Sequence, residues 1–293
     1  MNQSLNKLLA TFNDALDHSI EKSQLHTQLE ESMIYSLKAG GKRVRPLLLL
    51  ATLDMLQPKS EDKGLNTAIA LEMIHTYSLI HDDLPAMDDD NLRRGKPTNH
   101  KVYGEWLAIL AGDALLTKAF EYISNDTTLS AETRIQLVSA LSLASGHQGM
   151  VGGQTLDMQS ESKAVDLSTL EQIHMHKTGA LIRFAIEAAT IIAHVDNDIQ
   201  KQLITFANHL GIIFQIKDDL LDLFGTTEAL GKQTGSDDMN DKSTYVTLLG
   251  REKAESILAQ HVEEAEQILS TLSQTYNTEN LDYLLKLFYQ RQN

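Results

Sequence analysis

The distribution of proline is the feature that most constrains how this chain can fold. All four prolines lie in the first third of the sequence, the last being Pro97, and residues 98–293 contain none. Proline removes a backbone N–H and clashes inside a helix, so it breaks helices. A long proline-free stretch in which apolar residues recur about every 3.6 positions therefore predicts a succession of long helices.

Four apolar runs are the strongest helix candidates, at residues 67–80, 105–122, 181–194 and 203–223. The first is apolar nearly all round, which predicts a buried helix, and the last is again mostly apolar. No alternation of period two lasts long enough to predict strands. Because neither a flexible linker nor an internal repeat divides the chain, we expect one all-α domain over residues 1–293, with many long helices around a deep central cavity.

Composition narrows the classes of function. The chain has 25 Lys and Arg against 40 Asp and Glu, a net charge of −15, which disfavours binding to nucleic acid or to anionic membranes. The absence of cysteine excludes disulfides and thiol catalysis. No apolar run reaches the ~20 residues of a membrane span. Residues 1–16 do not resemble a signal peptide, so we expect a cytoplasmic protein without stable membrane insertion.

Two acidic clusters follow apolar helices. The run HDDLPAMDDD contains Asp82 and Asp88, and the run DDLLD contains Asp218 and Asp222, which share one helix face. Pro85 should end the first helix, so that Asp88 can fold back beside Asp82. Close carboxylates repel each other unless a hard cation such as Mg²⁺ lies between them. One such cluster could equally be solvated helix-end charge, but two at apolar helix ends favour a metal site.

Basic residues lie near the first acidic cluster in the sequence and just before an apolar run. Lys42, Arg43 and Arg45 follow a glycine turn in GGKRVRP, and Arg93 and Arg94 come directly after the aspartates. Each group alone would more commonly be a solvated loop. Together with two metal clusters they predict a diphosphate that is bound both directly by Lys and Arg and through Mg²⁺.

A few polar residues interrupt the apolar helices and need buried partners. His75 lies two helical turns before Asp82, on nearly the same face, which makes it a candidate phosphate donor rather than a core histidine. Gln215 stands likewise seven residues before the last aspartate of the second cluster. The pair Lys177-Thr178 interrupts a third apolar region with a similar implication.

These residues together resemble the trans-isoprenyl diphosphate synthases, and most closely the bacterial members that make farnesyl diphosphate. The resemblance runs from about residue 35 to residue 245 and more weakly to the C-terminus. The family's motifs match at residues 40–46 (GGKRxRP), 82–88 (DDxxxxD), 152–157 (GGQxxD), 177–178 (Lys-Thr) and 218–222 (DDxxD).

The resemblance implies two substrate sites. Isopentenyl diphosphate would be held without metal by four residues, Lys42, Arg45, His75 and Arg94. The allylic diphosphate, dimethylallyl or geranyl, would be bound through three Mg²⁺ ions held by Asp82, Asp88, Asp218 and Asp222. Side chains that complete the allylic site would be Arg93, Lys177, Thr178, Gln215, Lys232 and Lys242. Of these, Lys177, Thr178 and Gln215 would act in catalysis, because they lie near the developing allylic cation. The loop before Lys242 is one residue longer than the family pattern.

The activity implied is a head-to-tail condensation that gives (2E,6E)-farnesyl diphosphate and diphosphate for isoprenoid biosynthesis, by a homodimeric prenyltransferase. A geranylgeranyl or other chain-length synthase is the alternative. A terpene cyclase shares the aspartates but has no use for a second, metal-free diphosphate site. A metal-dependent phosphohydrolase would need His and Asp ligands in addition to His81-Asp82, and none is apparent at fitting positions. A non-catalytic partner subunit should have lost one acidic cluster, and this chain keeps both.

Product length is predicted to depend on Tyr77. It precedes Asp82 by five residues, which places it about 7–8 Å below that carboxylate along the helix. A growing hydrocarbon tail must run down between the helices, and a ring at this depth can close the tunnel. Ser78 is small and leaves Tyr77 as the floor. The alternative is a core aromatic whose hydroxyl is bonded elsewhere.

Overall fold

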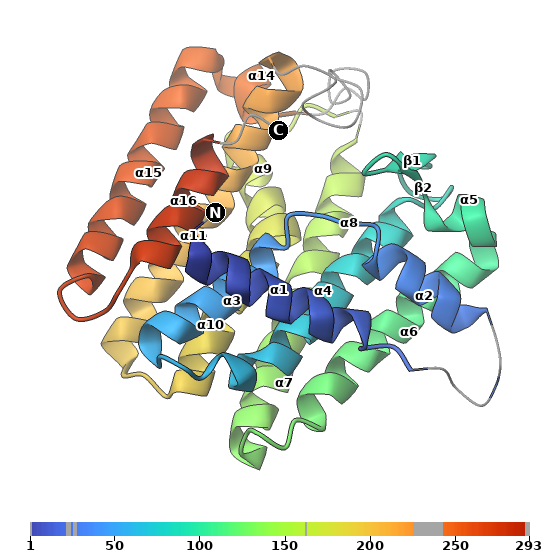
Figure 1. The fold of residues 1–293 in the computed structure, drawn as a ribbon. Coiled ribbons are helices and arrows are strands. Elements are labelled where there is room, and N and C mark those ends of the chain that lie inside the picture. The colour runs from blue at the N-terminus through green and yellow to red at the C-terminus, as the bar shows by residue number, and fades with distance from the viewer. Residues whose placement is uncertain (1, 22–24, 26–27, 162, 225–242, 291–293) are drawn as a thin grey trace.

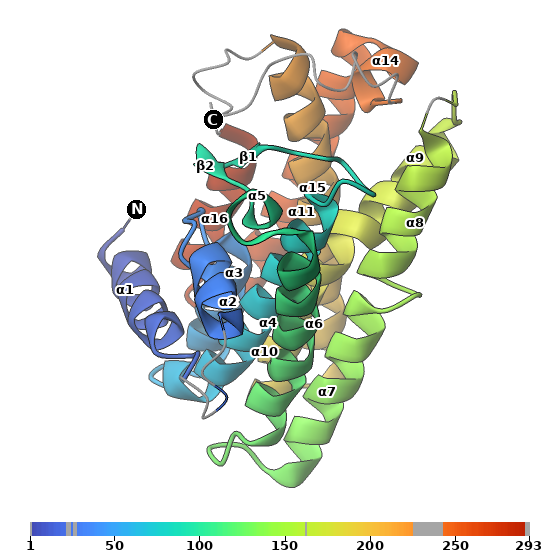
Figure 2. The same cartoon turned by 90° about the vertical axis from the view of Figure 1, so that its right-hand side faces the viewer.

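The computed structural model describes residues 2–21, 25, 28–161, 163–224 and 243–290. The described chain is a bundle of helices with one very small hairpin, as Figures 1 and 2 show from two sides. The first elements are α1(Gln3–Asp17), α2(Leu29–Leu37), α3(Val44–Leu56), α4(Glu61–Asp82), β1(Leu92–Arg93), β2(Lys96–Pro97), α5(Asn99–Tyr103) and α6(Glu105–Ser124). They are followed by α7(Ala131–Ser145), α8(Met150–Ser160), α9(Leu167–His174), the π-helical turn η1(Met175–Gly179), α10(Ala180–Ala193), α11(Asn197–Phe224), α14(Tyr245–Leu249), α15(Arg251–Leu272) and α16(Glu279–Gln290).

The four predicted helices are confirmed as α4, α6, α10 and α11. Each apolar run lies almost wholly inside its helix, and α4 and α6 continue beyond it into more polar turns. Helix α4 has buried residues on all sides, as the sequence predicted, because α3, α6 and α10 all pack against it. The all-α expectation therefore holds for the part of the chain described.

The core lies between α3, α4, α10 and α11, with the other long helices around them (Figure 1). Helix α3 is the most deeply buried, since nearly every residue from Pro46 to Leu53 is shielded from solvent. A short apolar helix enclosed on all faces gives a rigid base for the residues at its N-terminus. Lys42 and Arg45 are in that position. None of the helices described has both the length and the hydropathy that crossing a bilayer would require.

The hairpin differs from the expectation that no strand would form. β1 and β2 are two residues each and pair antiparallel, Leu92 opposite Pro97 and Arg93 opposite Lys96. The turn between them is Arg94-Gly95, and both residues have positive φ angles, 54° and 76°. Two positive φ angles are the mark of a tight hairpin turn whose twist matches the strands. Strands this short carry no period-two pattern, so no signal for them exists in the sequence.

Candidate active site

One cavity of about 1610 Å³ opens among α3, α4, α8, η1 and α11. Every predicted site residue that the structure describes lines it: Lys42, Arg45, His75, Tyr77, Ser78, Asp82, Asp88, Arg93, Arg94, Lys177, Thr178, Gln215, Asp218 and Asp222. Lys232 and Lys242 lie outside the described residues. Side chains up to 180 positions apart in sequence thus share one cavity.

The first acidic cluster forms where α4 ends. The helix stops at Asp82, and the backbone N–H of Asp88 donates to the carbonyl of Asp82 at 2.9 Å, so the loop folds back as predicted. Burial raises the pKa of Asp82 to about 6; the charge of Asp88 adds to the rise, and Lys177 opposes it. Ionising this carboxyl group is costly, and a cation bound beside it would stabilise the ionised form.

Lys177 reaches this cluster from a π-helical turn. Its Nζ lies 2.6 Å from Oδ2 of Asp157, in the GGQxxD motif on α8. Gly153 of the same motif packs directly on the backbone of Lys177, where a Cβ atom would overlap it. The glycine therefore lets α8 and η1 approach closely, and the wider turn carries Lys177 and Thr178 into the cavity. Such π-turns occur often at functional sites.

The second acidic cluster lies near the C-terminal end of α11. Asp218 and Asp222 are one helical turn apart and both line the cavity. Asp219, between them, has a structural role, because its buried Oδ2 accepts the backbone N–H of Tyr245 at 2.8 Å. This hydrogen bond holds the start of α14 against α11. The sequence motif contains Asp219 without distinguishing this role, because the partner lies 26 residues later.

The hairpin places two arginines in different environments. Arg93 forms an ion pair with Asp83, with Nε donating to Oδ1 at 2.7 Å. Burial opposes the charge of Arg93, but the hydrogen bond and charge of Asp83 outweigh it and raise its pKa. Arg94 instead donates to the carbonyl of Gly40 and lies flat against Gly41. The hairpin thus connects the first acidic cluster to the glycine turn that carries Lys42.

Arg45 and His75 meet on the same side of the cavity. Nη1 of Arg45 lies 3.3 Å from Nε2 of His75, and since arginine can only donate, that nitrogen is the acceptor. Burial, followed by the charges of Arg45 and Arg94, keeps the pKa of His75 well below its usual value, so its imidazole is neutral. Burial also lowers the pKa of Arg45 to about 10, with Arg94 adding and Glu72 and Asp218 opposing.

Sequence reasoning missed a buried ion pair beneath this group. Arg43, which has a left-handed backbone conformation, is paired with Glu72 of α4 and donates to the carbonyl of Leu37. Glu72 is 2 % exposed, so its charge would be costly without the arginine. The only sequence signal was a glutamate within an apolar run. The pair joins the start of α3 to α4, next to the basic residues that line the cavity. In the neighbouring Arg45, Nε is buried and has no hydrogen-bond partner among the described residues.

Tyr77 lies below the aspartates on the same helix. Its side chain is 5 % exposed, lines the cavity and meets the ring of His81 edge-on at 5.8 Å between centroids. Burial raises the pKa of its hydroxyl to about 12. The Oγ of Ser78 donates to the carbonyl of His75 at 2.9 Å. No hydrogen bond of the Tyr77 hydroxyl occurs among the described residues, so no such bond ties this side chain to a neighbour.

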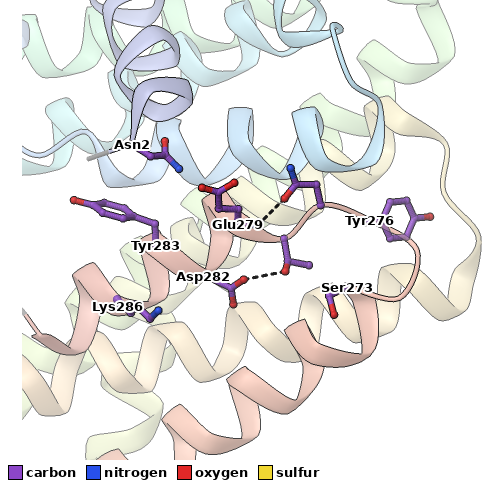
Figure 3. A pocket seen from close by; sticks show the side chains of 9 residues that line it. Asn2, Ser273, Tyr276, Glu279, Asp282, Tyr283 and Lys286 are labelled. Carbon is purple, nitrogen blue, oxygen red and sulfur yellow. Dashed lines mark hydrogen bonds between the residues drawn. The ribbon is translucent and has the colours of Figure 1, made fainter.

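A second hollow, of about 610 Å³, lies where α15 turns into α16 (Figure 3). Its polar groups bond to one another: Thr278 donates to Asp282 at 2.9 Å, and the N–H of Glu279 donates to Asn277 at 3.1 Å. Among the described residues, Lys286 is the one basic side chain that lines it. Two acidic residues and one lysine do not suit a diphosphate, so the large cavity is the candidate site.

Comparison with known proteins agrees with this geometry. A family model described as polyprenyl synthetase matches residues 26–281. The chain is 51 % identical to a farnesyl diphosphate synthase of Bacillus subtilis over 90 % of this chain and 89 % of the relative. It is 48 % identical to a chloroplastic geranylgeranyl pyrophosphate synthase of Capsicum annuum, over 88 % and 70 %. Among solved structures, the geranyltransferase of Helicobacter pylori, complexed with magnesium and isoprenyl diphosphate, superposes with a TM-score of 0.87 at 33 % identity, covering 99 % of both chains.

Proposed function

The chain belongs to the polyprenyl synthetase family and has its helical isoprenoid synthase fold, and from this premise we propose what it makes and how. As an enzyme of this family it is a prenyltransferase that condenses isopentenyl diphosphate head to tail with an allylic diphosphate. We propose that it uses dimethylallyl or geranyl diphosphate and releases farnesyl diphosphate as its main product. The B. subtilis relative, named for that product, supports the proposal.

One observation carries the assignment of two substrates. A single cavity holds two carboxylate clusters and, beside them, a basic group of Lys42, Arg45 and Arg94. Carboxylate oxygens are the ligands that Mg²⁺ prefers, and Asp82 is poorly stabilised as an anion without a cation, so the donor set fits magnesium. The basic group offers its positive charge directly and suits a diphosphate bound without metal. A cyclase, which binds one diphosphate, has no need for both.

The side chains divide the reaction between them. We assign Asp82, Asp88, Asp218 and Asp222 to hold three Mg²⁺ ions, which when bound stabilise the departing diphosphate of the allylic substrate. Lys177 adds a fixed positive charge on the same side, as do Arg93 and, by resemblance, Lys232 and Lys242.

The remaining side chains act on the cation and its partner. Thr178 and Gln215 direct oxygen atoms toward the allylic carbon as positive charge develops there. Lys42, Arg45, His75 and Arg94 hold isopentenyl diphosphate so that its double bond is close and aligned, and His75 also accepts a hydrogen bond from Arg45. Apolar walls that include Leu181 and Phe214 exclude water from the cation.

Two further parts of the proposal are the product length and the assembly. Tyr77 closes the tunnel below Asp82, which favours fifteen carbons over the twenty of the C. annuum relative's named product. The homodimer rests on an apolar surface of α6, where Trp106 is 67 %, Ile109 38 % and Leu110 46 % exposed. These residues are three and four positions apart and so form one exposed stripe along α6.

A product assay tests the proposal directly. The purified chain is incubated with Mg²⁺, isopentenyl diphosphate and, in separate reactions, dimethylallyl or geranyl diphosphate, and the products are identified by mass. We expect farnesyl diphosphate from both starters and none when a chelator is in excess. A main product of twenty or more carbons would contradict the chain length, and a cyclic hydrocarbon would contradict the reaction.

A further inference from the structure

Three potential metal ligands converge at the contact between α11 and α15, away from the cavity. Nδ1 of His209 on α11 lies 2.8 Å from Nδ1 of His261 on α15. Oε2 of Glu264, one turn further along α15, lies 3.4 Å from the first nitrogen and 3.7 Å from the second. The side chains of the two histidines are only 15 % and 21 % exposed. Three donors therefore point at one partly buried spot.

The nitrogen pair suits a shared cation as well as a hydrogen bond. The two rings can share one proton in an Nδ1–H···Nδ1 hydrogen bond, or both can carry their proton on Nε2 and present the two Nδ1 lone pairs to a cation. Burial lowers the pKa of both histidines, and in His261 the charge of His209 adds to the effect, so the rings are in the neutral form that binds metals. The cluster thus offers two lone pairs and a carboxylate to a single cation.

The carboxylate is already oriented toward the two imidazoles. Nε2 of Gln260 donates to Oε1 of Glu264 at 3.1 Å, which fixes the side chain and leaves Oε2 directed at the histidines. Hydrogen bonds of this kind to the second oxygen commonly position ligands around metals. The pKa of Glu264 is lowered, first by this hydrogen bond, with smaller effects from the two histidines.

The spot is separate from the cavity. His209 precedes Asp218 by nine residues on the same helix, which is about 13–14 Å along the axis and half a turn around it. The two residues therefore point to opposite sides of α11, one toward α15 and the other into the cavity. Neither His209, His261 nor Glu264 lines that cavity.

We propose that His209, His261 and Glu264 form a second metal site, for Zn²⁺ or a similar borderline-soft transition ion, that links α15 to α11. Imidazole nitrogens favour such ions over Mg²⁺, and two histidines with one carboxylate leave the fourth tetrahedral position for water. Ligands at about 2.0–2.1 Å from zinc are about 3.3 Å apart, so the carboxylate distances fit and the nitrogens need to separate by about 0.5 Å. The ion would hold α15 against the helix that carries the second acidic cluster.

Metal binding by the full chain tests the site. The protein is stripped with a chelator, returned to millimolar Mg²⁺ so that the carboxylate clusters are occupied, and titrated with Zn²⁺ in a calorimeter and with Co²⁺ in a spectrophotometer. We expect one tight site per chain, a higher melting temperature with Zn²⁺, and the intense visible absorption of four-coordinate cobalt. In His209→Gln and His261→Gln, binding should weaken by more than ~100-fold and the absorption should disappear.

Matched variants separate this site from the others. Glu263→Gln removes an exposed carboxylate next to Glu264 and should leave binding unchanged, whereas Glu264→Gln should weaken it. Asp82→Ala should also leave the cobalt spectrum unchanged, because it alters only the cavity. If a histidine variant fails to fold, the wild-type spectrum decides the question. The proposal is overturned if the wild type shows no four-coordinate cobalt, or if both histidine variants retain the tight site.

Discussion

Neighbouring aspartates of the first acidic cluster differ in what they contact. Asp82 and Asp88 face the cavity, whereas Asp89 turns away and lies 3.5 Å from Nζ of Lys101. A run of aspartates thus separates into cavity-facing and surface positions because the backbone bends. The positive φ of Asp89, 48°, is part of that bend.

This difference gives a matched pair of variants. Asp82→Ala should reduce turnover by at least ~100-fold, because it removes one charge stabiliser of the departing diphosphate. Asp218→Ala should do the same, and Asp89→Ala should keep most of the activity. Steady-state rates at saturating Mg²⁺ measure the effect. Equal losses in the Asp82 and Asp89 variants would show that the cluster acts by its overall charge.

We expect the ring of Tyr77 to limit the length of the product. Tyr77→Ala should open the tunnel and give products of twenty or more carbons, with little loss in the first condensation. Tyr77→Phe keeps the ring and removes only the hydroxyl, so it should still give fifteen carbons. Chain lengths are read by mass spectrometry after long incubation. An unchanged distribution in a folded, active Tyr77→Ala enzyme would mean that the floor lies elsewhere.

The buried imidazole of His174 should make the free energy of unfolding depend on pH. Its ring stacks on Tyr245 at 5.7 Å between centroids, and its buried Nε2 has no partner among the described residues. Burial lowers its pKa to about 4; Asp157 opposes this and Lys177 adds to it. Between about pH 6.5 and 4 only the unfolded chain takes up the proton, so stability falls as the pH falls, by up to about 1.4 kcal/mol per pH unit from this group.

Replacing the imidazole should remove that contribution. His174→Phe keeps a ring for stacking but cannot be protonated, so its free energy of unfolding should fall less steeply between pH 7 and 4. Urea unfolding at several pH values, without Mg²⁺ or substrate, measures the slope. His18→Asn, at the exposed end of α1, serves as the control for replacing a histidine at the surface. A slope in His174→Phe equal to that of the wild type would contradict the assignment.

At the scale of elements, the hairpin and the glycine turn act as one unit. Arg94, at the tip of the hairpin, lies on Gly41 so closely that a Cβ atom would come within 2.5 Å of its guanidinium. Gly41 also has a φ of 123°, which side chains disfavour. The two loops therefore bring Lys42 and Arg94 together at the cavity only if position 41 has no side chain.

Gly41→Ala should thus weaken the binding of isopentenyl diphosphate more than that of the allylic substrate. Displacing Arg94 loses a charge-assisted contact, so we expect the KM for isopentenyl diphosphate to rise by about 10-fold or more. Gly40→Ala is the control: its φ is 97°, but nothing lies within 4 Å of its Cβ position. Similar KM values for the two variants would attribute the effect to backbone strain rather than to Arg94.

At the scale of the whole molecule, the sequence predicted what is locally encoded. The four long helices follow from their apolar spacing, and the approach of Asp88 to Asp82 follows from a proline placed between them. The contacts that the sequence did not predict are those between residues far apart in the chain. The pairing of Arg43 with Glu72 joins two helices, and Asp219 holds a backbone N–H that arrives 26 residues later. Such contacts exist only after the helices have packed.

The roles of residues within the site depend on more than their spacing. Spacing alone predicts carboxylates for a metal and basic groups for phosphate, whereas the division into two substrate sites depends on the resemblance to a family. The π-turn that carries Lys177 had no sequence signal beyond a polar pair within an apolar region. The closeness of Gly153 to its backbone explains why the turn can widen there.

Assembly is the property of the whole molecule that its surface predicts. An outward stripe on α6 exposes Trp106, Ile109 and Leu110, and covering it with the same stripe of a second copy would remove these side chains from water. We therefore expect sedimentation at twice the chain mass of 32.6 kDa.

The double variant Trp106→Glu/Leu110→Glu should sediment as a monomer, since anchors of this kind each contribute about 2 kcal/mol or more. Gln267→Glu places a charge on exposed α15, on the opposite flank of the bundle, and should leave the dimer intact (Figure 1). A monomeric wild type, or a double variant that dimerises as tightly as Gln267→Glu, would show that this stripe is not the interface.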